Sequence, residues 1–338
     1  MEPVETGIGA SARVLLKWWR TWGTLPVFSW VRAASSYRRG DFQKAETLYL
    51  SGLKRHKGHP AEAYARLDLA YCLFKNGKIE QAERELRLVI SSVNNPREAL
   101  LRLARLQLWS GRPLEAAWTV RRMLRDFQPD ADMVEVLSLS VIENRGPVYL
   151  HREAMEALKK LDEAQKQETR IRAVRAGLNL CKNPCEEAQM ELEELAASGQ
   201  ADFETLTILS ELLLKAGKVA HARMYLKRAL AREASHPRVL GLLAETYLSE
   251  GSLFNALFAV QLATAACQNS QWLSVRAMHV LALAYRSSGD SQTALIMAEK
   301  ARKTGNRTLG DYPHARSLNQ LVEELNAEQA DGLKSRAA

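Results

Sequence analysis

The chain has 338 residues, a formal net charge of +8, and 46% hydrophobic and 25% charged residues, the composition of a soluble helical protein. Its four cysteines are too few for a disulfide framework and favour a reducing, cytoplasmic compartment. Residues 1–60 hold ten Lys and Arg against four Asp and Glu, so most of the excess charge belongs to the N-terminal end. The remainder is nearly balanced, which argues against a polyanion-binding surface over the whole chain.

The first segment, "SARVLLKWWRTWGTLPVFSW" from Ser11 to Trp30, holds four of the seven tryptophans. It is not a signal peptide, because Lys17 and Arg20 interrupt the apolar run and no small-residue cleavage site follows. Its longest uncharged run, residues 21–31, is too short to span a bilayer.

Three interpretations of this segment stay open: a cap on the helical repeats that follow, a contact with a membrane or a partner, or a flexible tail. Tryptophan beside Lys and Arg suits the interface of an anionic bilayer. The membrane interpretation assigns the contact to Lys17, Trp18, Trp19, Arg20 and Trp22. On that interpretation, the protein lies peripherally at the inner face of a membrane.

A glycine followed five residues later by alanine recurs along the chain in a fixed phase. The six in-phase pairs are Gly40/Ala45, Gly77/Ala82, Gly111/Ala116, Gly217/Ala222, Gly251/Ala256 and Gly289/Ala294. From Gly77 on, each of these glycines has a leucine eight positions earlier and a small residue seven positions earlier. The glycines are 37, 34, 106, 34 and 38 residues apart, and the long interval has room for two more units. This constant period predicts an array of repeats.

Each unit is predicted to be a pair of helices. Before Gly77, Ala65, Leu69 and Leu73 lie on one helical face, and the same period resumes at Ile79. Glycine ends the first helix, and the small residues let the two helices cross closely. The unit resembles the tetratricopeptide repeat (TPR), a helix-turn-helix of about 34 residues, although the family tryptophan is missing from every copy. The resemblance implies an all-α, right-handed superhelix of about eight helical hairpins in one elongated domain, with capping helices at its ends.

The repeat phase also predicts the organisation of the chain. The expected segments are a basic, Trp-rich N-terminal segment or cap (1–25), three repeats (26–129), two degenerate repeats (130–202), three repeats (203–302), a C-terminal capping helix (303–328) and a disordered tail (329–338).

Catalytic and metal-binding motifs are absent from the sequence. The Gly7–Ala12 stretch matches a dinucleotide fingerprint but has no preceding strand, and "CKNPC" at Cys181–Cys185 has no further ligands at zinc spacing. His56 and His59 fall in an inter-repeat turn, where we expect them to be solvated. The carboxylates within Glu186–Glu194 belong to the solvent-exposed face of an amphipathic helix. We therefore expect no enzyme activity, cofactor or metal.

The resemblance implies that the first helices line a groove that binds a protein or peptide partner. With the turn glycine at repeat position 15, the groove stripe is positions 2, 5, 9, 12 and 13. In the first three units this stripe includes Trp30, Tyr37, Tyr64, Leu67, Tyr71, Phe74, Arg105, Leu108 and Trp109. In the last three units it includes Glu204, Glu211, Glu245, Arg276, His279 and Arg286. Aromatic residues and Arg are the usual anchors of protein interfaces, so the first set is the predicted partner site and the second a charged secondary site.

These features predict a non-catalytic scaffold or adaptor. The family's chaperone-binding carboxylate clamp is not expected, because Arg105 alone has the required chemistry at the corresponding positions. The alternative is an RNA-binding helical-repeat protein. Nucleic acid is disfavoured, because no polar groove position recurs and Glu204, Glu211 and Glu245 would repel phosphate.

Overall fold

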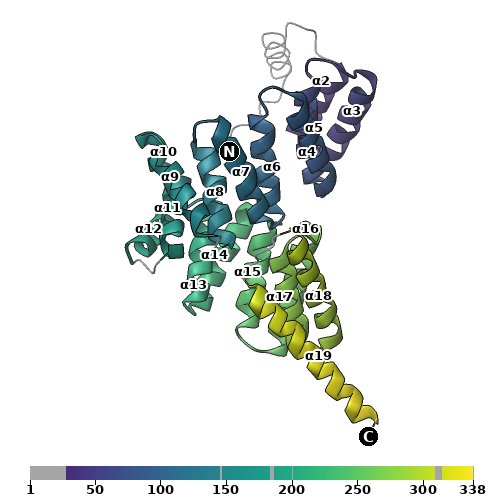
Figure 1. The fold of residues 1–338 in the computed structure, drawn as a ribbon, viewed down its shortest axis with the longest axis vertical. Helices are drawn as coiled ribbons and strands as arrows, with labels where there is room; N and C mark the ends of the chain where they lie inside the picture. Colours follow the sequence, from purple (N-terminus) through teal and green to yellow (C-terminus); the bar gives the residue numbers. More distant parts are fainter. Residues whose placement is uncertain (1–27, 145–146, 183–185, 200, 309–313, 338) are drawn as a thin grey trace. The chain divides into compact units, whose positions relative to one another are not determined.

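The computed structural model describes residues 28–144, 147–182, 186–199, 201–308 and 314–337, and within these ranges the regular structure is entirely helical (Figure 1). The all-α prediction is confirmed. The Trp-rich segment with Lys17, Trp18, Trp19, Arg20 and Trp22 lies outside the described residues.

Sixteen helices of the described ranges form eight hairpins of two successive helices. They are α2 (Phe28–Arg38) with α3 (Phe42–Arg55), α4 (Glu62–Lys75) with α5 (Ile79–Ser92), α6 (Arg97–Trp109) with α7 (Pro113–Asp126), α8 (Ala131–Asn144) with α9 (Val148–Lys159), α11 (Thr169–Lys182) with α12 (Glu186–Ala197), α13 (Phe203–Lys215) with α14 (Val219–Arg232), α15 (Pro237–Leu248) with α16 (Leu253–Asn269), and α17 (Val275–Ser287) with α18 (Ser291–Thr308). A short helix, α10 (Glu163–Gln167), precedes α11, and α19 (Ala315–Ala337) follows the last hairpin.

The turn glycines end the first helix of a hairpin as their spacing predicts. All six in-phase glycines have a positive φ, from +69° at Gly251 to +89° at Gly289. At Gly77 the backbone N–H of Lys78 donates to the carbonyl of Leu73 at 2.8 Å, which closes the helix end. A residue with a Cβ would be strained in this left-handed conformation, so glycine is the residue that suits the turn.

Small residues lie where the two helices of a hairpin cross. Ala70, Ala104, Ser210, Ala244 and Ala282, seven positions before the turn glycines, are all buried. The alanines five positions after the glycines are buried as well. Close helix packing without room for larger side chains is therefore the structural cause of the sequence period.

The chain divides into two compact units, residues 1–106 and 107–338, with the boundary inside α6. Each repeat of a solenoid packs only against its neighbours, so the continuity of an array depends on every interface in turn. The single elongated domain expected from the repeats stays a prediction.

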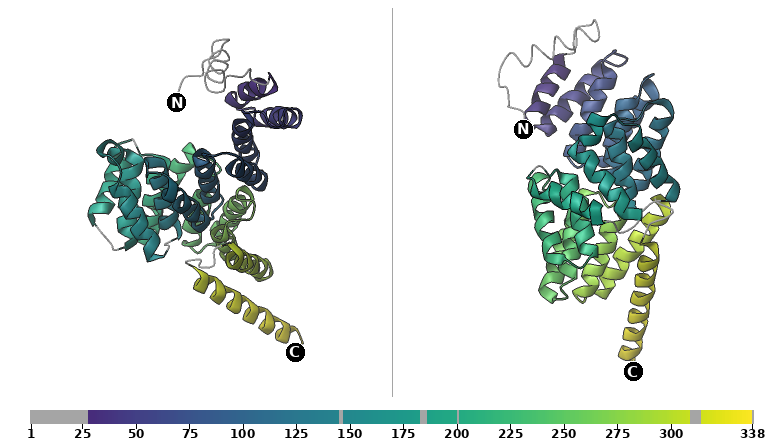
Figure 2. Two further views of the ribbon diagram at one scale, coloured as in Figure 1. Left: turned by 45° about the horizontal axis from the view of Figure 1, so that its top comes forward. Right: turned by 90° about the vertical axis from the view of Figure 1, so that its left-hand side faces the viewer.

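The second unit ends in α19, which packs one apolar face onto the last hairpin. Leu318, Leu321, Val322 and Leu325 are buried in a core cluster that also contains Leu281 of α17. The helix continues to Ala337, past residue 328 where the repeat phase predicts a disordered tail (Figures 1 and 2). Of these nine extra residues, Gln329, Ala330, Leu333, Lys334, Arg336 and Ala337 have high helix propensity.

Candidate functional site

Four aromatic rings gather at the first two hairpins of the N-terminal unit. The Tyr71 ring lies 5.3 Å from Tyr37, 5.8 Å from Phe42 and 6.2 Å from Phe74 between centroids, each in an edge-to-face arrangement. The Lys75 ammonium lies 5.4 Å from the Tyr71 centroid and 5.5 Å from that of Phe74. Such pairs hold one another in place, so the half-buried rings form a pre-organised surface, which we call the aromatic surface.

A polar network backs these rings. The Tyr49 hydroxyl donates to Asp68 Oδ2 at 3.0 Å, and Arg102 Nη1 lies 3.8 Å from Asp68 Oδ1 and donates to the carbonyl of Leu67 at 3.1 Å. Burial, with the Asp68 carboxylate nearby, raises the pKa of Tyr37 to about 12. Tyr37 therefore stays a neutral hydrogen-bonding group across the physiological range.

Tyr64, 46% exposed, lies on the same face of α4 as Tyr71, as the helical period predicts. Phe42 was missed because it begins the second helix of its hairpin, outside the groove stripe. Leu67 is buried, with Arg102 bound to its carbonyl, so its side chain offers almost no surface to a partner.

Trp30 is fully buried and is therefore a core residue, contrary to its expected place in the groove. A Cβ at Gly52 of α3 would come within 2.5 Å of Trp30 Cδ1, so the missing side chain makes room for the indole. The rings of His56 and His59 pack against the indole at centroid distances of 6.2 and 5.3 Å. These two histidines were expected to be solvated, and His59 is in fact half-buried.

Trp109, predicted to extend the aromatic site, belongs to the second unit instead. Its ring lies 4.3 Å from that of His236, which in turn lies 4.6 Å from Phe203. Burial, reinforced by Arg238, lowers the pKa of His236 to about 3, so this stack holds a neutral imidazole. Leu108 beside it is half-buried, and Arg105 is exposed at the end of the first unit. Trp109 thus contributes to intramolecular packing.

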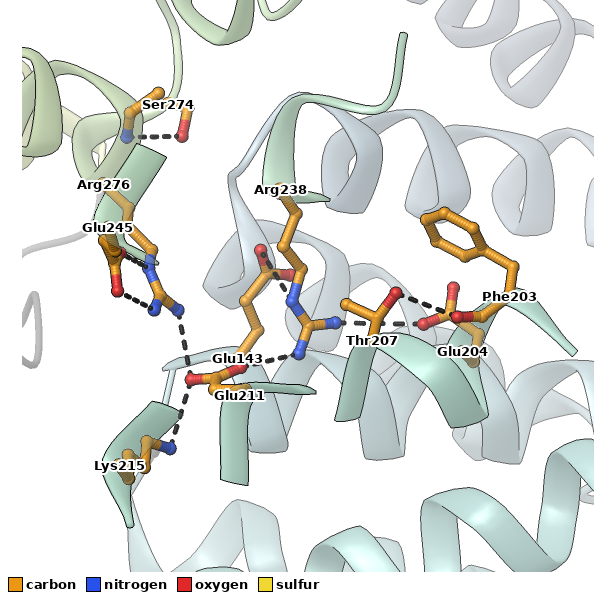
Figure 3. Close-up of polar contacts among 11 residues, drawn as sticks. Glu143, Phe203, Glu204, Thr207, Glu211, Lys215, Arg238, Glu245, Ser274 and Arg276 are labelled. Atoms are coloured by element: carbon orange, nitrogen blue, oxygen red, sulfur yellow. Dashed lines mark hydrogen bonds and ion pairs between the residues drawn. The ribbon is translucent and has the colours of Figure 1, made fainter. Parts of the chain in front are cut away.

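In the second unit, a cluster of charged side chains joins the first helices α8, α13, α15 and α17 of four hairpins (Figure 3). Arg238 donates to Glu211 at 3.0 Å and lies 3.8 Å from Glu204 and 3.9 Å from Glu143. Arg276 bonds Glu211 at 3.1 Å and Glu245 at 3.0 and 3.3 Å. Lys215 lies 3.1 Å from Glu211, which therefore has three cationic partners.

Burial and pairing drive the pKa values of these carboxyls apart. Burial alone would raise the pKa of Glu211, but Arg276, Arg238 and Lys215 outweigh it and hold the pKa well below its ordinary range. Burial raises the pKa of Glu204 to about 8 and also raises that of Glu143, despite the opposing attraction of Arg238. Glu211 is thus the charged centre of the cluster, and Glu204 is largely protonated at neutral pH.

The predicted charged groove residues are therefore bound mainly to one another. His279 is buried, and Arg286 bonds Glu324 and, at 2.7 Å, Glu328 of α19. Arg238 was not among the predicted residues, although it occupies the same repeat position as Glu204 and Arg276, thirteen residues before its turn glycine. Glu143 had no such signal, because its unit lacks the glycine–alanine pair that sets the phase: His151 stands five residues after Gly146.

The protonation of Glu204 predicts a pH-dependent stability. A carboxyl whose pKa is higher in the folded chain favours folding at low pH, and this contribution is lost as the pH rises from about 4.5 to about 8. Glu204→Gln, which resembles the protonated acid, should raise the melting temperature by about 2–4 °C or more near pH 8 and leave it nearly unchanged near pH 4. Thermal scans at both pH values measure this. The control is Glu211→Gln. It should lower the melting temperature near pH 8, because it removes the charged carboxylate that Arg276, Arg238 and Lys215 stabilise.

Across the described residues, no group of three or more His, Cys, Asp or Glu could hold a metal ion. Within the same ranges, no helix has the length and apolar character needed to cross a bilayer. Cys181 is exposed at the end of α11, and Cys185 lies outside the described residues.

The sequence pattern of the tetratricopeptide repeat matches residues 32–92 and 209–271, and a second pattern of the same name matches residues 274–321. Together these matches cover just over half of the chain. The chain belongs to the tetratricopeptide repeat family. A search of curated proteins finds no significant match to this TPR chain.

The solved structures that match the chain include a tetratricopeptide repeat protein and a TPR domain. One from Parabacteroides merdae matches at 12% identity and a TM-score of 0.40, over 94% of this chain and 99% of that chain. The TPR2AB domain of yeast Sti1, solved as a complex with pHSP90, matches at 15% and 0.31, over 88% and 97%. Yeast Tom70 matches at 12% and 0.34, over 89% and 96%. TPR arrays are generally non-enzymatic scaffolds for protein binding.

Proposed function

We propose that this TPR chain is a non-catalytic scaffold or adaptor that binds a partner protein or peptide on the aromatic surface of its N-terminal unit. The observation that carries the proposal is the set of interlocked rings of Tyr37, Phe42, Tyr71 and Phe74. Rigid rings bury a large apolar area at low entropic cost, which is why aromatic side chains dominate interface hot spots.

The charges beside the rings support a partner with acidic character. Exposed Arg38 and Arg39 follow Tyr37, and exposed Lys44 and Lys75 follow Phe42 and Phe74. Asp41 is the exposed carboxylate within the same turn. We therefore propose a peptide segment that places apolar side chains on the rings and carries Asp or Glu beside them.

The proposal is tested by panning a displayed peptide library on the full chain and measuring the selected peptides by isothermal titration calorimetry. Tyr71→Ser/Phe74→Ser should weaken binding by at least about tenfold, because each lost anchor costs about 1–3 kcal/mol. Enriched peptides should combine apolar and acidic residues.

The control is Leu88→Ser, which removes an apolar side chain that is 49% exposed, more than the half-buried Tyr71 and Phe74, from α5 of the same unit. It should bind the selected peptides as the unaltered chain does. Circular dichroism shows whether each variant keeps its helicity. Peptides that bind the Tyr71→Ser/Phe74→Ser variant undiminished would place the partner elsewhere on the array.

A finer proposal, on the N-terminal segment, accompanies this function. The segment with Trp18, Trp19 and Trp22 is proposed to add a peripheral contact with the cytoplasmic face of a membrane, supported by its tryptophans and flanking cations.

RNA binding is the alternative function. It predicts an affinity that falls steeply between about 50 and 200 mM salt, whereas binding by burial of aromatic rings depends much less on salt. A salt titration with the selected peptide and with single-stranded RNA distinguishes the two.

A further inference from the structure

The last three hairpins expose a large apolar side chain at the same repeat position. Met224, Phe258 and Ile296 each stand seven residues after a turn glycine, in the second helices α14, α16 and α18. Each lies on the side of its helix opposite the buried alanines that face the first helices. Single exposed apolar residues are ordinary, but a recurring set on successive helices marks an interaction surface.

Helix α16 enlarges this set, because it is apolar on both its buried and its outward side. Its 17 residues include no charged side chain, and Leu253, Phe254 and Leu257 are exposed beside Phe258. We call Met224, Leu253, Phe254, Leu257, Phe258 and Ile296 the apolar ridge; their exposed fractions run from 37% to 79%.

Side-chain contacts tie the helices of the ridge together. The Arg223 guanidinium of α14 lies 4.0 Å from the Tyr247 ring centroid, and Tyr247 lies 4.7 Å from Phe258 of α16. On the other side, the Lys300 ammonium of α18 lies 3.8 Å from the ring centroid of Trp272, in the turn after α16. These contacts connect Phe258 to α14 through Tyr247, and the end of α16 to α18 through Trp272.

Cationic side chains flank the ridge on both sides. Helix α14 exposes Lys227, Arg228 and Arg232, and α18 exposes Lys300, Arg302 and Lys303. Among the described side chains of α14, α16 and α18, the one carboxylate is Glu299. An apolar strip between two basic borders is complementary to a surface that is apolar inside and negatively charged outside.

We propose that the apolar ridge docks the protein on an anionic phospholipid bilayer. The ridge side chains enter the boundary between headgroups and acyl chains, and the flanking Lys and Arg meet the lipid phosphates and carboxylates. A second copy of the chain fits less well, because a symmetric contact would bring the basic borders together. An acidic amphipathic helix would present a single apolar stripe, narrower than a ridge spread over three helices.

The test is co-sedimentation of the full chain with vesicles of phosphatidylcholine alone or with phosphatidylserine added. It is made in a Trp18→Ser/Trp22→Ser background, so that the N-terminal segment cannot supply the contact. We expect binding to the anionic vesicles, and Phe254→Ser/Leu257→Ser should lower the partition coefficient at least about tenfold. Lys227→Gln/Lys303→Gln should lower binding to the anionic vesicles by a similar factor.

The matched control is Leu88→Ser/Met190→Ser, which removes two exposed apolar side chains outside the ridge and should bind as its parent does. Equal binding by the Phe254→Ser/Leu257→Ser variant would overturn the proposal, as would a parent that stays in the supernatant with both vesicles. In the second case, binding of an acidic amphipathic peptide to the ridge would identify a protein partner instead. Peptide binding at the aromatic surface is measured separately, so either proposal can fail alone.

Discussion

Replacing Arg238 by methionine is expected to destabilise the second unit by about 3–5 kcal/mol, the largest effect predicted for any single residue of the charged cluster. Arg238 is buried and faces Glu211, Glu204 and Glu143 at 3.0, 3.8 and 3.9 Å. Methionine keeps much of the volume but removes the guanidinium that donates to the Glu211 carboxylate and lies beside the buried Glu143 carboxyl. Urea unfolding followed by circular dichroism measures the change, and hydrogen exchange locates it in α8, α13 and α15.

The matched control is Arg122→Met on α7, where the side chain is exposed, and the expected change is below about 0.5 kcal/mol. Adding Glu143→Gln to Arg238→Met should recover part of the loss at neutral pH, because an amide, unlike the Glu143 carboxyl, does not have to bind a proton in order to be buried without the guanidinium. An Arg238→Met chain as stable as the original would mean that the cluster is solvated and energetically minor.

The second large effect is expected for Gly111→Ala. Gly111 has φ +74°, and a Cβ there would lie 2.5 Å from Ser274 Cβ and 3.1 Å from Ser274 Cα. The alanine therefore meets both backbone strain and a steric clash between the α6–α7 turn and the residue before α17. The expected destabilisation is about 2–4 kcal/mol, the sum of a left-handed residue and an overpacked contact. Urea unfolding gives the free energy.

Gly217→Ala separates these two causes, because Gly217 has almost the same φ, +73°, and a Cβ added there would meet nothing within 4 Å. It should cost about 1 kcal/mol, the backbone strain alone. Ser274 also caps α17, since its Oγ accepts from the backbone N–H of Ala277 at 3.2 Å. Ser274→Gly removes the Cβ and Oγ that the new alanine would meet, so it should restore part of the stability lost in Gly111→Ala. The loss of the cap itself should cost about a few tenths of a kcal/mol. Equal losses at Gly111 and Gly217 would refute the close approach.

The hairpins could be predicted because each repeat position has a local role. A glycine five residues before a buried alanine specifies a turn and a close crossing without reference to the rest of the chain, as Gly77 and Ala82 do. The degenerate stretch of residues 130–202 lacks this glycine signal, yet it also forms two hairpins, α8–α9 and α11–α12. The length of this stretch is close to twice the repeat period, and that length predicted two further hairpins.

The site residues were less predictable, because helical period assigns a face but not the neighbours of that face. Trp30 fits the groove stripe by its position in the repeat, and the absent side chain of Gly52 leaves room for it in the core. Tyr71 and Trp109 fall on the same predicted stripe, yet the unit boundary inside α6 separates them. Glu211 and Arg276 looked like separate groove charges until the packing brought them within 3.1 Å.

By itself, the sequence determined the family, the helical hairpins and the position of their turns, since these depend on residues within one period. The tertiary structure decided which side chains pack inside the molecule and which remain at its surface. The stack on His236, the charged cluster around Arg238 and the apolar ridge all combine residues from different hairpins. Their chemistry depends on distances that no single repeat encodes.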